Sequence, residues 1–403
     1  MKTPLPILLL TVSSAIAGPA FTAKTVDDKI SIGYGLAIGD VDGDKKPDIL
    51  LADAKEIVWY KNPGWEKSVI AKNLTLRDNV CIAARDLDGD GKVEIAVGAQ
   101  WNPIETTNEA ESGAVFYLMR PEKAGDLWKP VILPHEPTVH RMNWVRTGVN
   151  QFALVVLPLH GRGNVNGAGP AGSKIIAYYF PDTPADEVAW KQVVIDDTMH
   201  VTHNFDLRPA GGPVGGPDRD VEELIIGGKE ALLSATPDGP GWRTHQLTIA
   251  ETGGLPAFGG AGELRFGQGQ AREGWGAWTI ACIEPFHGPN LTLLIMNADM
   301  RTWNRQVLDT TFNQGHALAT GIVFGEKRPQ IVAGWREPNA AKQFGIKIYH
   351  EEAGTWKSDW VGEPNTMACE DLKLADLDGD GRPEIIAAGR STKNVVIYSL
   401  SKP

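Results

Sequence analysis

The sequence predicts an all-β protein that folds as a seven-bladed β-propeller, with the N-terminal strand closing the last blade. Three observations support this fold class. A strand pattern led by an aromatic residue recurs seven times along the 403 residues. A short β-rich run, such as Ile57–Tyr60, lies ahead of the successive copies. Apolar residues alternate or form short blocks between 45 glycines and 27 prolines, which disfavours long helices.

The repeated pattern is an aromatic residue followed by polar and then aliphatic residues. Six copies begin at Trp65, Trp128, Trp190, Trp242, Trp303 and Trp356, and the seventh, Phe21–Val26, begins with phenylalanine. Successive copies start 44 to 63 residues apart, the range expected for four-stranded blades. Periodic strands would also fit an open β-sandwich array or a β-helix, but the sevenfold count favours the propeller.

The two ends of the chain supply complementary parts of one blade. Val395–Leu400 resembles a third strand, yet no aromatic-led strand follows it. We therefore expect Phe21–Val26 to be the outermost strand of the last blade, an exchange that leaves no open sheet edge at the closure. Residues 18–403 are then one propeller domain.

Residues 1–17 have the pattern of a signal peptide. Lys2 precedes the apolar run Pro6–Val12, and small residues at Ala15 and Ala17 suit a cleavage site. We expect an exported protein, periplasmic or secreted, without a transmembrane segment and most simply a monomer. The net charge of −11 disfavours a nucleic-acid partner, because phosphate binding needs a basic face. The three scattered cysteines indicate free thiols rather than a disulfide scaffold.

A second repeat is acidic and predicts calcium sites. Aspartates at alternate positions, a glycine and a further carboxylate precede an aliphatic strand in three places. Such a loop can surround a hard cation with oxygen ligands, and the glycine permits the tight turn. The predicted ligands are Asp40, Asp42, Asp44 and Asp48 in blade 1, Asp86, Asp88, Asp90 and Glu94 in blade 2, and Asp376, Asp378, Asp380 and Glu384 in blade 7.

These acidic loops resemble the FG-GAP/VCBS repeat of integrin-like and many bacterial propellers. The resemblance implies calcium in blades 1, 2 and 7, up to three ions. In blade 6 the segment 321–332 aligns with 39–50 but has lost the ligands. Blades 3, 4 and 5 depart further from the repeat, so no calcium is expected there.

Alignment of the blades predicts a ring of functional groups at one mouth of the central channel. Counting back from the acidic loops places Tyr34, His316 and Glu370 at one level. Approximate alignment adds His140 and His203 from blades 3 and 4, and Trp275 or Trp278 from blade 5. His160 follows a strand of blade 3. Propeller mouths are where variable loops can carry function without disturbing blade packing.

Two readings of this histidine set stay open at this stage. Each histidine could be a satisfied polar residue in a narrow channel. Alternatively, His140, His203, His316 and Glu370 could hold zinc or another transition metal, or a histidine could act as a general base. The catalytic candidates are His140, His160, His203, His316, Arg141 and Tyr34. The predicted substrate contacts are Trp144, Trp275, Trp278, Arg162 and Asn204.

A second resemblance concerns blades 3 and 4. The segments His140–Trp144, Leu157–Gly163 and Met199–Phe205 are similar to the propeller of aldos-2-ulose dehydratases and, more distantly, to propeller-type polysaccharide lyases such as ulvan lyases. This resemblance implies a carbon–oxygen lyase that performs β-elimination on an oxidised or uronic sugar. The cupin domains of the dehydratases have no counterpart here. The alternatives are a non-catalytic propeller that binds carbohydrate or protein, and a metal-dependent glycoside hydrolase.

Overall fold

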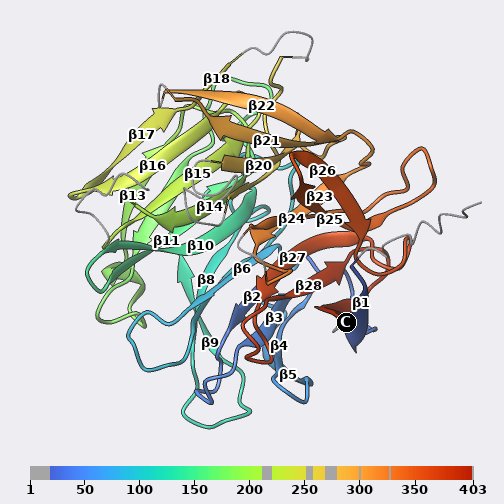
Figure 1. Cartoon of the computed structure of the whole chain (residues 1–403). Helices are drawn as coiled ribbons and strands as arrows, with labels where there is room; N and C mark the ends of the chain where they lie inside the picture. The colour runs from blue at the N-terminus through green and yellow to red at the C-terminus, as the bar shows by residue number, and fades with distance from the viewer. Residues whose placement is uncertain are drawn as a thin grey trace, which may run out of the picture.

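The computed structural model describes residues 19–210, 220–250, 257–267, 279–298, 301–325 and 328–401. The strands of this part form seven sheets arranged as a seven-bladed β-propeller (Figure 1). Within each blade, successive strands pair antiparallel from the innermost outward. The predicted fold class is confirmed. The predicted signal peptide lies outside the described residues.

The first four blades follow the chain in order. Blade 1 contains β2 (Gly35–Gly39), β3 (Asp48–Ala52), β4 (Glu56–Lys61) and β5 (Glu66–Lys72). Blade 2 contains β6 (Cys81–Arg85), β7 (Glu94–Gly98), β8 (Val115–Met119) and β9 (Lys129–Leu133). Blade 3 contains β10 (Val139–Gly148), β11 (Gln151–Pro158), β12 (Ile175–Tyr179) and, after the short 3-10 helix η1 (Glu187–Ala189), β13 (Lys191–Asp196). Blade 4 contains β14 (Thr202–Pro209), β15 (Glu222–Gly228), β16 (Leu232–Asp238) and β17 (Gly241–Gln246).

Blades 5 and 6 also run outward from the channel. Blade 5 contains β19 (Glu263–Phe266), β20 (Thr279–Glu284), β21 (Asn290–Met296) and β22 (Thr302–Asp309), and β18 (Thr248–Ile249) pairs parallel with β22. Blade 6 contains β23 (Gly315–Gly321), β24 (Gln330–Trp335), β25 (Gly345–Glu352) and β26 (Thr355–Trp360). Sequence alignment predicted that the inner strand of blade 5 begins beside Trp275 or Trp278. The innermost strand is instead β19, which begins at Glu263. Those two tryptophans lie outside the described residues.

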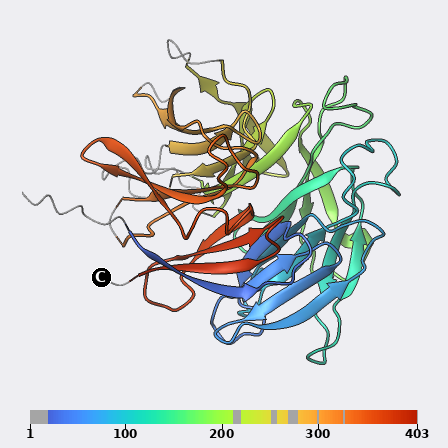
Figure 2. The ribbon, with the colours of Figure 1, turned by 90° about the vertical axis from the view of Figure 1, so that its right-hand side faces the viewer.

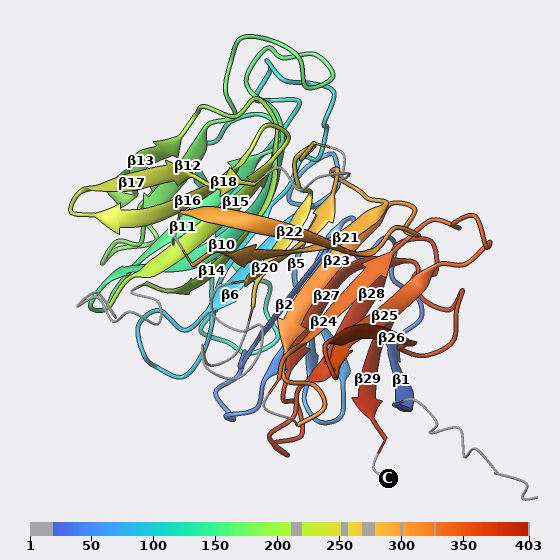
Figure 3. The same ribbon diagram turned by 45° about the horizontal axis from the view of Figure 1, so that its top comes forward.

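Blade 7 joins both ends of the chain. It contains β27 (Cys369–Ala375), β28 (Glu384–Gly389), β29 (Val395–Leu400) and, outermost, β1 (Phe21–Asp27). β1 runs antiparallel to β29, with Phe21 opposite Leu400 and Ala23 opposite Tyr398. Figures 2 and 3 show the two strands side by side. The predicted closure by the N-terminal strand is therefore confirmed.

The core is divided among the interfaces between blades. In the described part of the chain each pair of adjacent blades shares one hydrophobic cluster, including the pair formed by blades 7 and 1. The repeated aromatic residue joins the cluster shared with the preceding blade. Trp128 of blade 2 packs with blade 1, and Trp190 of blade 3 packs with blade 2. Phe21 of blade 7 likewise packs with blade 6. The sequence repeat thus reflects burial of one large ring per interface.

Two further predictions concern the cysteines and the membrane. Cys81, Cys282 and Cys369 are buried free thiols, as predicted. None of the helices in the described ranges is both long and apolar enough to cross a membrane.

Candidate functional site

The channel mouth is built from two positions in each blade, the start of the innermost strand and the turn after the second strand. His140, His203, His316 and Glu370 are each the second residue of an innermost strand. The pairing register shifts at all four positions, which marks a β-bulge in each strand. A bulge redirects a side chain out of the regular alternation. The same local irregularity therefore presents these four side chains at the mouth.

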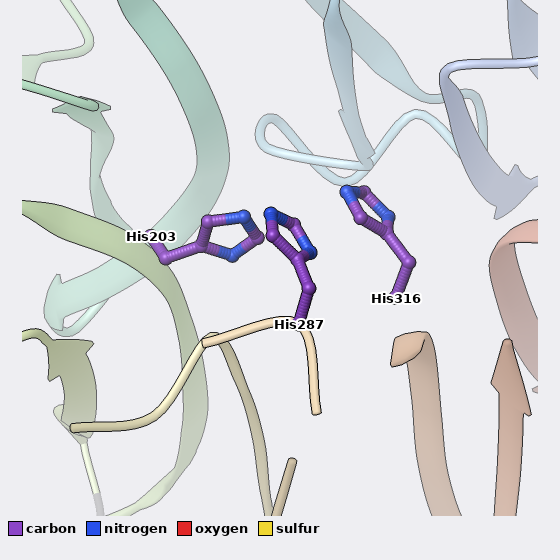
Figure 4. Close-up of side chains that lie close together, drawn as sticks. All are labelled: His203, His287 and His316. Carbon is purple, nitrogen blue, oxygen red and sulfur yellow. The ribbon is translucent and has the colours of Figure 1, made fainter. Parts of the chain in front are cut away.

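Three histidines come close enough to share one ligand. Ring nitrogens of His203, His287 and His316 all lie within 4.8 Å of one another. The ring centroids are 4.7 Å apart for His203 and His287, 4.8 Å for His287 and His316, and 5.6 Å for His203 and His316. Figure 4 shows the three rings next to one another, each carried by a different segment of the chain. Their blades are 4, 5 and 6.

Hydrogen bonds fix which nitrogen of two rings remains available. The Nδ1 of His203 lies 2.7 Å from the carbonyl oxygen of Gly262, and the Nδ1 of His316 lies 2.7 Å from that of Glu370. A carbonyl oxygen can only accept, so each Nδ1 carries the proton and each Nε2 keeps a lone pair. This is the arrangement that orients histidines as metal ligands. The Nδ1 of His287 is buried without a hydrogen-bond partner.

His140 lies at the edge of this group. Its ring stacks on Trp101 at 4.9 Å and meets the His203 ring at 4.6 Å. The side chain is only 5% exposed, and its Nε2 has no hydrogen-bond partner. An unpaired ring nitrogen in a buried site is costly unless a ligand completes it. His140 is thus available for a bound molecule rather than for the three-histidine group.

The environment keeps the imidazoles uncharged. Burial, followed by the charge of Arg141, lowers the pKa of His140 well below its usual value. Burial and then Arg336 do the same to the pKa of His316, while burial and then His203 lower the pKa of His287 to about 2. These rings are neutral at neutral pH, which is the form that binds metals and accepts protons.

Two buried glutamates flank the histidines and are held by cations. Glu370 accepts hydrogen bonds from Arg336 at 2.7 Å and from Arg390 at 2.9 Å. Glu263 accepts one from the Asn204 amide at 2.6 Å. Burial tends to raise the pKa of Glu263, but the His203 imidazole and the charges of Arg265 and Arg141 outweigh it and lower that pKa to about 2. The mouth therefore holds fixed charges of both signs.

The predicted site residues divide between those that the mouth collects and those that it does not. Tyr34 lies there, 8% exposed, with its ring 5.4 Å from the guanidinium carbon of Arg390. Burial raises the pKa of Tyr34. His160 is half-buried and makes none of the ring contacts described above, although its Nδ1 is unpaired. Glu370, predicted as a metal ligand, is instead neutralised by two arginines.

Two predicted substrate contacts are placed elsewhere. Trp144 is fully buried, packs against Tyr117 and Trp190, and donates its Nε1–H to the carbonyl of Glu94. It is a core residue and cannot stack on a sugar. Arg162 is held by Glu109 and by Glu136 at 2.8 Å, so its guanidinium is not free.

Sequence alignment missed His287, together with Trp101, Arg336 and Arg390. All four come from turns that follow the second strand of a blade. Trp101 and His287 lie three residues after β7 and β20, and Arg336 and Arg390 come directly after β24 and β28. Two predicted residues, His160 and Arg162, also follow a second strand, β11. The four missed residues could have been found by examining the few positions after the end of each second strand, in addition to the positions at the start of each inner strand. Glu263 was missed because the inner strand of blade 5 was misplaced.

The mouth opens onto a channel cavity of about 300 Å³. Its wall is formed by the inner strands of blades 1, 2, 3, 4, 5 and 7. Tyr34, Arg141 and Asn204 line it together with Arg265 and Lys373. His140, His203, His287 and His316 are not among the residues that line it.

The three acidic loops share one hydrogen-bond scheme at the other end of the inner strands. In blade 2, Asp86 accepts from the backbone of Gly89 and Gly91, and Glu94 accepts from Leu87 at 2.7 Å. Blades 1 and 7 repeat it. Carboxylate oxygens lie within 4.8 Å of one another in the groups Asp40, Asp42 and Asp48; Asp86, Asp88 and Asp90; and Asp376, Asp378 and Glu384. These groups are geometrically able to hold a cation.

Blade 6 shows what the loop becomes without carboxylates. Gln330 occupies the position of Glu94, and its Oε1 accepts from the backbone of Val323 at 2.8 Å and Phe324 at 3.0 Å. A neutral amide thus closes the turn. The carboxylates of blades 1, 2 and 7 are not needed for the turn alone.

Comparison with known proteins identifies the repeats and the fold. Residues 40–97 match the FG-GAP-like repeat, and residues 82–118 match the FG-GAP repeat. No curated protein sequence matches the chain.

Solved structures with a similar fold include a chain of the mitotic checkpoint complex, with a TM-score of 0.56 and 11% identity over 100% of this chain and 98% of that one. BBS1N in complex with ARL6DN gives a TM-score of 0.54 and 12% identity over 95% and 96%. The extracellular domain of a hybrid two-component system from B. thetaiotaomicron gives a TM-score of 0.52 and 10% identity over 96% of this chain and 40% of that one. At such identities the likeness shows the fold alone. The chain is a seven-bladed β-propeller whose blades 1 and 2 carry FG-GAP repeats.

Proposed function

We propose that this protein is an exported carbon–oxygen lyase or dehydratase that acts on an oxidised or uronic sugar at the histidine-lined mouth. The observation that carries the proposal is the convergence of His203, His287 and His316 within 4.8 Å. Three imidazoles from three blades suit zinc or a similar transition metal with an open coordination position. Buried unpaired groups beside them suit a substrate.

A metal at this position would act as a Lewis acid on the carbonyl or carboxylate oxygen of the sugar. We assign proton removal to His140, whose neutral ring has an unpaired Nε2. The proton leaves the carbon next to the carbonyl, its electron pair forms the carbon–carbon double bond, and the carbon–oxygen bond breaks. Tyr34, kept protonated by burial, donates a proton to the departing oxygen. Arg141 lies beside His140 and favours the developing negative charge.

We further propose that calcium occupies the acidic loops of blades 1, 2 and 7 and stabilises them. The carboxylate groups described above support this assignment, and FG-GAP repeats, which are typical of extracellular domains, support an exported location. In this arrangement calcium has a structural role, at the end of the inner strands away from the histidines.

The test is an elimination assay on a panel of keto-sugars and uronate polymers, with ultraviolet detection of the unsaturated product. Wild-type protein purified without chelators should produce it, whereas His140→Ala and His287→Ala should lose at least about 100-fold in rate. His245→Ala, which removes an exposed histidine of β17, is the control and should keep full activity.

Other outcomes point to the alternatives. A saturated product that depends on the same histidines would indicate hydrolysis by a metal-activated water instead of elimination. Sugar binding without turnover, in protein that contains no transition metal, would indicate a non-catalytic binding propeller. Either result contradicts the lyase assignment.

A further inference from the structure

A second pocket lies between blades 2 and 3, at the end of the propeller that carries the acidic loops. Its volume is about 660 Å³, within the range of small-molecule sites. Asp86 and Asp88 form one side, and Tyr117, Arg146 and Phe180 line the rest. The loop that holds Asp86 and Asp88 follows the end of inner strand β6, whereas His140, His203 and His316 lie at the starts of their inner strands. The pocket is therefore separate from the mouth.

Tyr117 brings a hydroxyl without a protein partner to the wall of this pocket. The residue is only 6% exposed, and its ring packs against Trp144, Phe180 and Trp190. No hydrogen bond to its hydroxyl is found among the described residues. Burial, and next the charge of Glu94, raise the pKa of Tyr117, so the hydroxyl keeps its proton. A hydroxyl that lines a pocket and has no protein partner is suited to a ligand oxygen.

Arg146 supplies a cation that is not committed to a carboxylate. Its guanidinium lies 5.7 Å from the ring centroid of Phe152, and no ion pair to an acidic side chain is found for it in the described ranges. The neighbouring Arg85, in contrast, is bound by Glu222 at 2.7 Å. A free guanidinium in a partly enclosed pocket favours a carboxylate ligand.

The aspartates of the three acidic loops differ in their ion pairs with lysine and arginine side chains. In blade 1, Lys61 pairs with Asp42 and with Asp44 at 3.3 Å. In blade 7, Arg382 pairs with Asp380 at 2.8 Å. Within the described part of the chain, no cationic side chain pairs with the aspartates of the blade 2 loop.

The glycines at the loop tips separate blade 1 from the other two loops. A Cβ added at Gly43 of blade 1 would lie 2.9 Å from the Lys92 side chain, whereas one added at Gly89 of blade 2 or at Gly379 of blade 7 would have no atom within 4 Å. A cation in the blade 2 loop would thus keep a side open towards the pocket.

We propose that this pocket binds a uronic acid unit of an acidic polysaccharide. Arg146 binds the sugar carboxylate, the Tyr117 hydroxyl donates to a ring oxygen substituent, and adjacent sugar hydroxyls complete the coordination of a calcium ion in the blade 2 loop. The half-buried ring of Phe180 offers an apolar face to the sugar. This inference rests on the calcium assignment above and is independent of any reaction at the histidines.

A sugar fits this set of groups better than an acidic peptide does. A peptide could offer a carboxylate to Arg146 or the cation and a carbonyl oxygen to Tyr117, but these groups lie on a flexible chain that must be ordered on binding. A uronate carries a carboxylate and several hydroxyls on one rigid ring, so a single unit can reach all three groups at small entropic cost.

The experiment is calorimetric titration of the full chain with trigalacturonate in the presence of calcium. Arg146→Gln should weaken binding at least about tenfold and Tyr117→Phe about three- to tenfold, because each removes one hydrogen-bonded contact. Asp88→Asn should abolish binding, whereas its blade 7 counterpart Asp378→Asn should leave it unchanged. Arg243→Gln, which alters an exposed arginine of β17, is the control for a general loss of positive charge.

Three results would overturn the proposal. The first is equal affinity for wild type and Arg146→Gln, and the second is equal weakening by Asp88→Asn and Asp378→Asn. The third is displacement of the sugar by hexa-aspartate at the same concentration, which would make the site a general polycarboxylate site. His316→Gln separates the two proposals, because it should abolish elimination while trigalacturonate still binds.

Discussion

The imidazole rings of His287 and His316 are stacked, with centroids 4.8 Å apart and an interplanar angle of 4°. One ring comes from a turn of blade 5 and the other from the inner strand of blade 6. Two neutral imidazoles buried face to face gain little by themselves, since each must also lose its hydration. A ligand bound by nitrogens of both rings would offset this loss of hydration.

The first prediction concerns the metal content. His287→Ala removes one of three ring nitrogens and should lower zinc or cobalt affinity at least about 100-fold, since a ligand is lost rather than a supporting group. Elemental analysis and cobalt absorption spectra of unchelated protein would measure this. Normal metal stoichiometry in His287→Ala would place the metal elsewhere. His245→Ala should bind metal as the wild type does.

The second prediction concerns calcium and stability. Chelation should lower the melting temperature by several degrees, because clustered carboxylates then repel one another without a counter-ion. Asp378→Asn should reduce the melting temperature in calcium but have little effect in chelator. Differential scanning calorimetry in both buffers is the measurement. If chelation leaves the wild-type transition unmoved, these loops do not use calcium for stability.

The third prediction is a pH dependence at the ring closure. Asp27 of β1 accepts a hydrogen bond from the Tyr60 hydroxyl at 2.7 Å and pairs with Lys67 at 3.0 Å. Partial burial opposes ionisation, but the Tyr60 and Lys29 hydrogen bonds and Lys67 outweigh it and lower the pKa of Asp27 below 3.8. A lowered folded-state pKa gives stability that is present above about pH 4 and is lost as the pH falls further.

Asp27→Asn tests this directly. It should cost about 1 kcal/mol in the free energy of unfolding at pH 7, and the difference from wild type should shrink below pH 4. Chemical denaturation at several pH values provides the comparison. A difference that stays constant down to pH 3 would mean that the Asp27 charge is not responsible. Asp28→Asn, next in sequence, is the matched control.

The fourth prediction separates packing from binding at Trp144. Because this side chain is fully buried between blades 2 and 3, Trp144→Ala should destabilise the protein by about 3 to 5 kcal/mol. Trp144→Phe should cost less and retain sugar binding. If Trp144→Phe lost sugar affinity without losing stability, Trp144 would be a substrate contact and not only a core residue.

The fold was predictable because its signals are local and repeated. The aromatic residue that leads each outer strand fills the same interface in every blade, so burial imposes the same residue type each time. The exchange of Phe21–Val26 into the last blade followed from counting strands. The acidic loops were recognisable because carboxylate spacing must match the turn itself.

The site was harder to predict, since its residues are brought together by the ring and not by the sequence. His287 lies in blade 5, which lacks an acidic loop to anchor an alignment. The inner strand β19 is short and more polar than β20, so the pattern of apolar residues favours β20 as the inner strand. Trp144 failed as a substrate contact because its burial between distant segments is not visible in a local pattern. The ion pairs of Arg162 with Glu109 and Glu136 are invisible for the same reason.

The pairing of β1 with β29 also sets an order of events for a newly made chain. β1 completes its pairing with β29 only after residue 400 has been added. Until then blade 7 lacks its two outer strands, and the hydrophobic interface between blades 7 and 1 is incomplete. Closure of the ring therefore joins two segments from opposite ends of the described chain, and it must wait until both segments are free to pair.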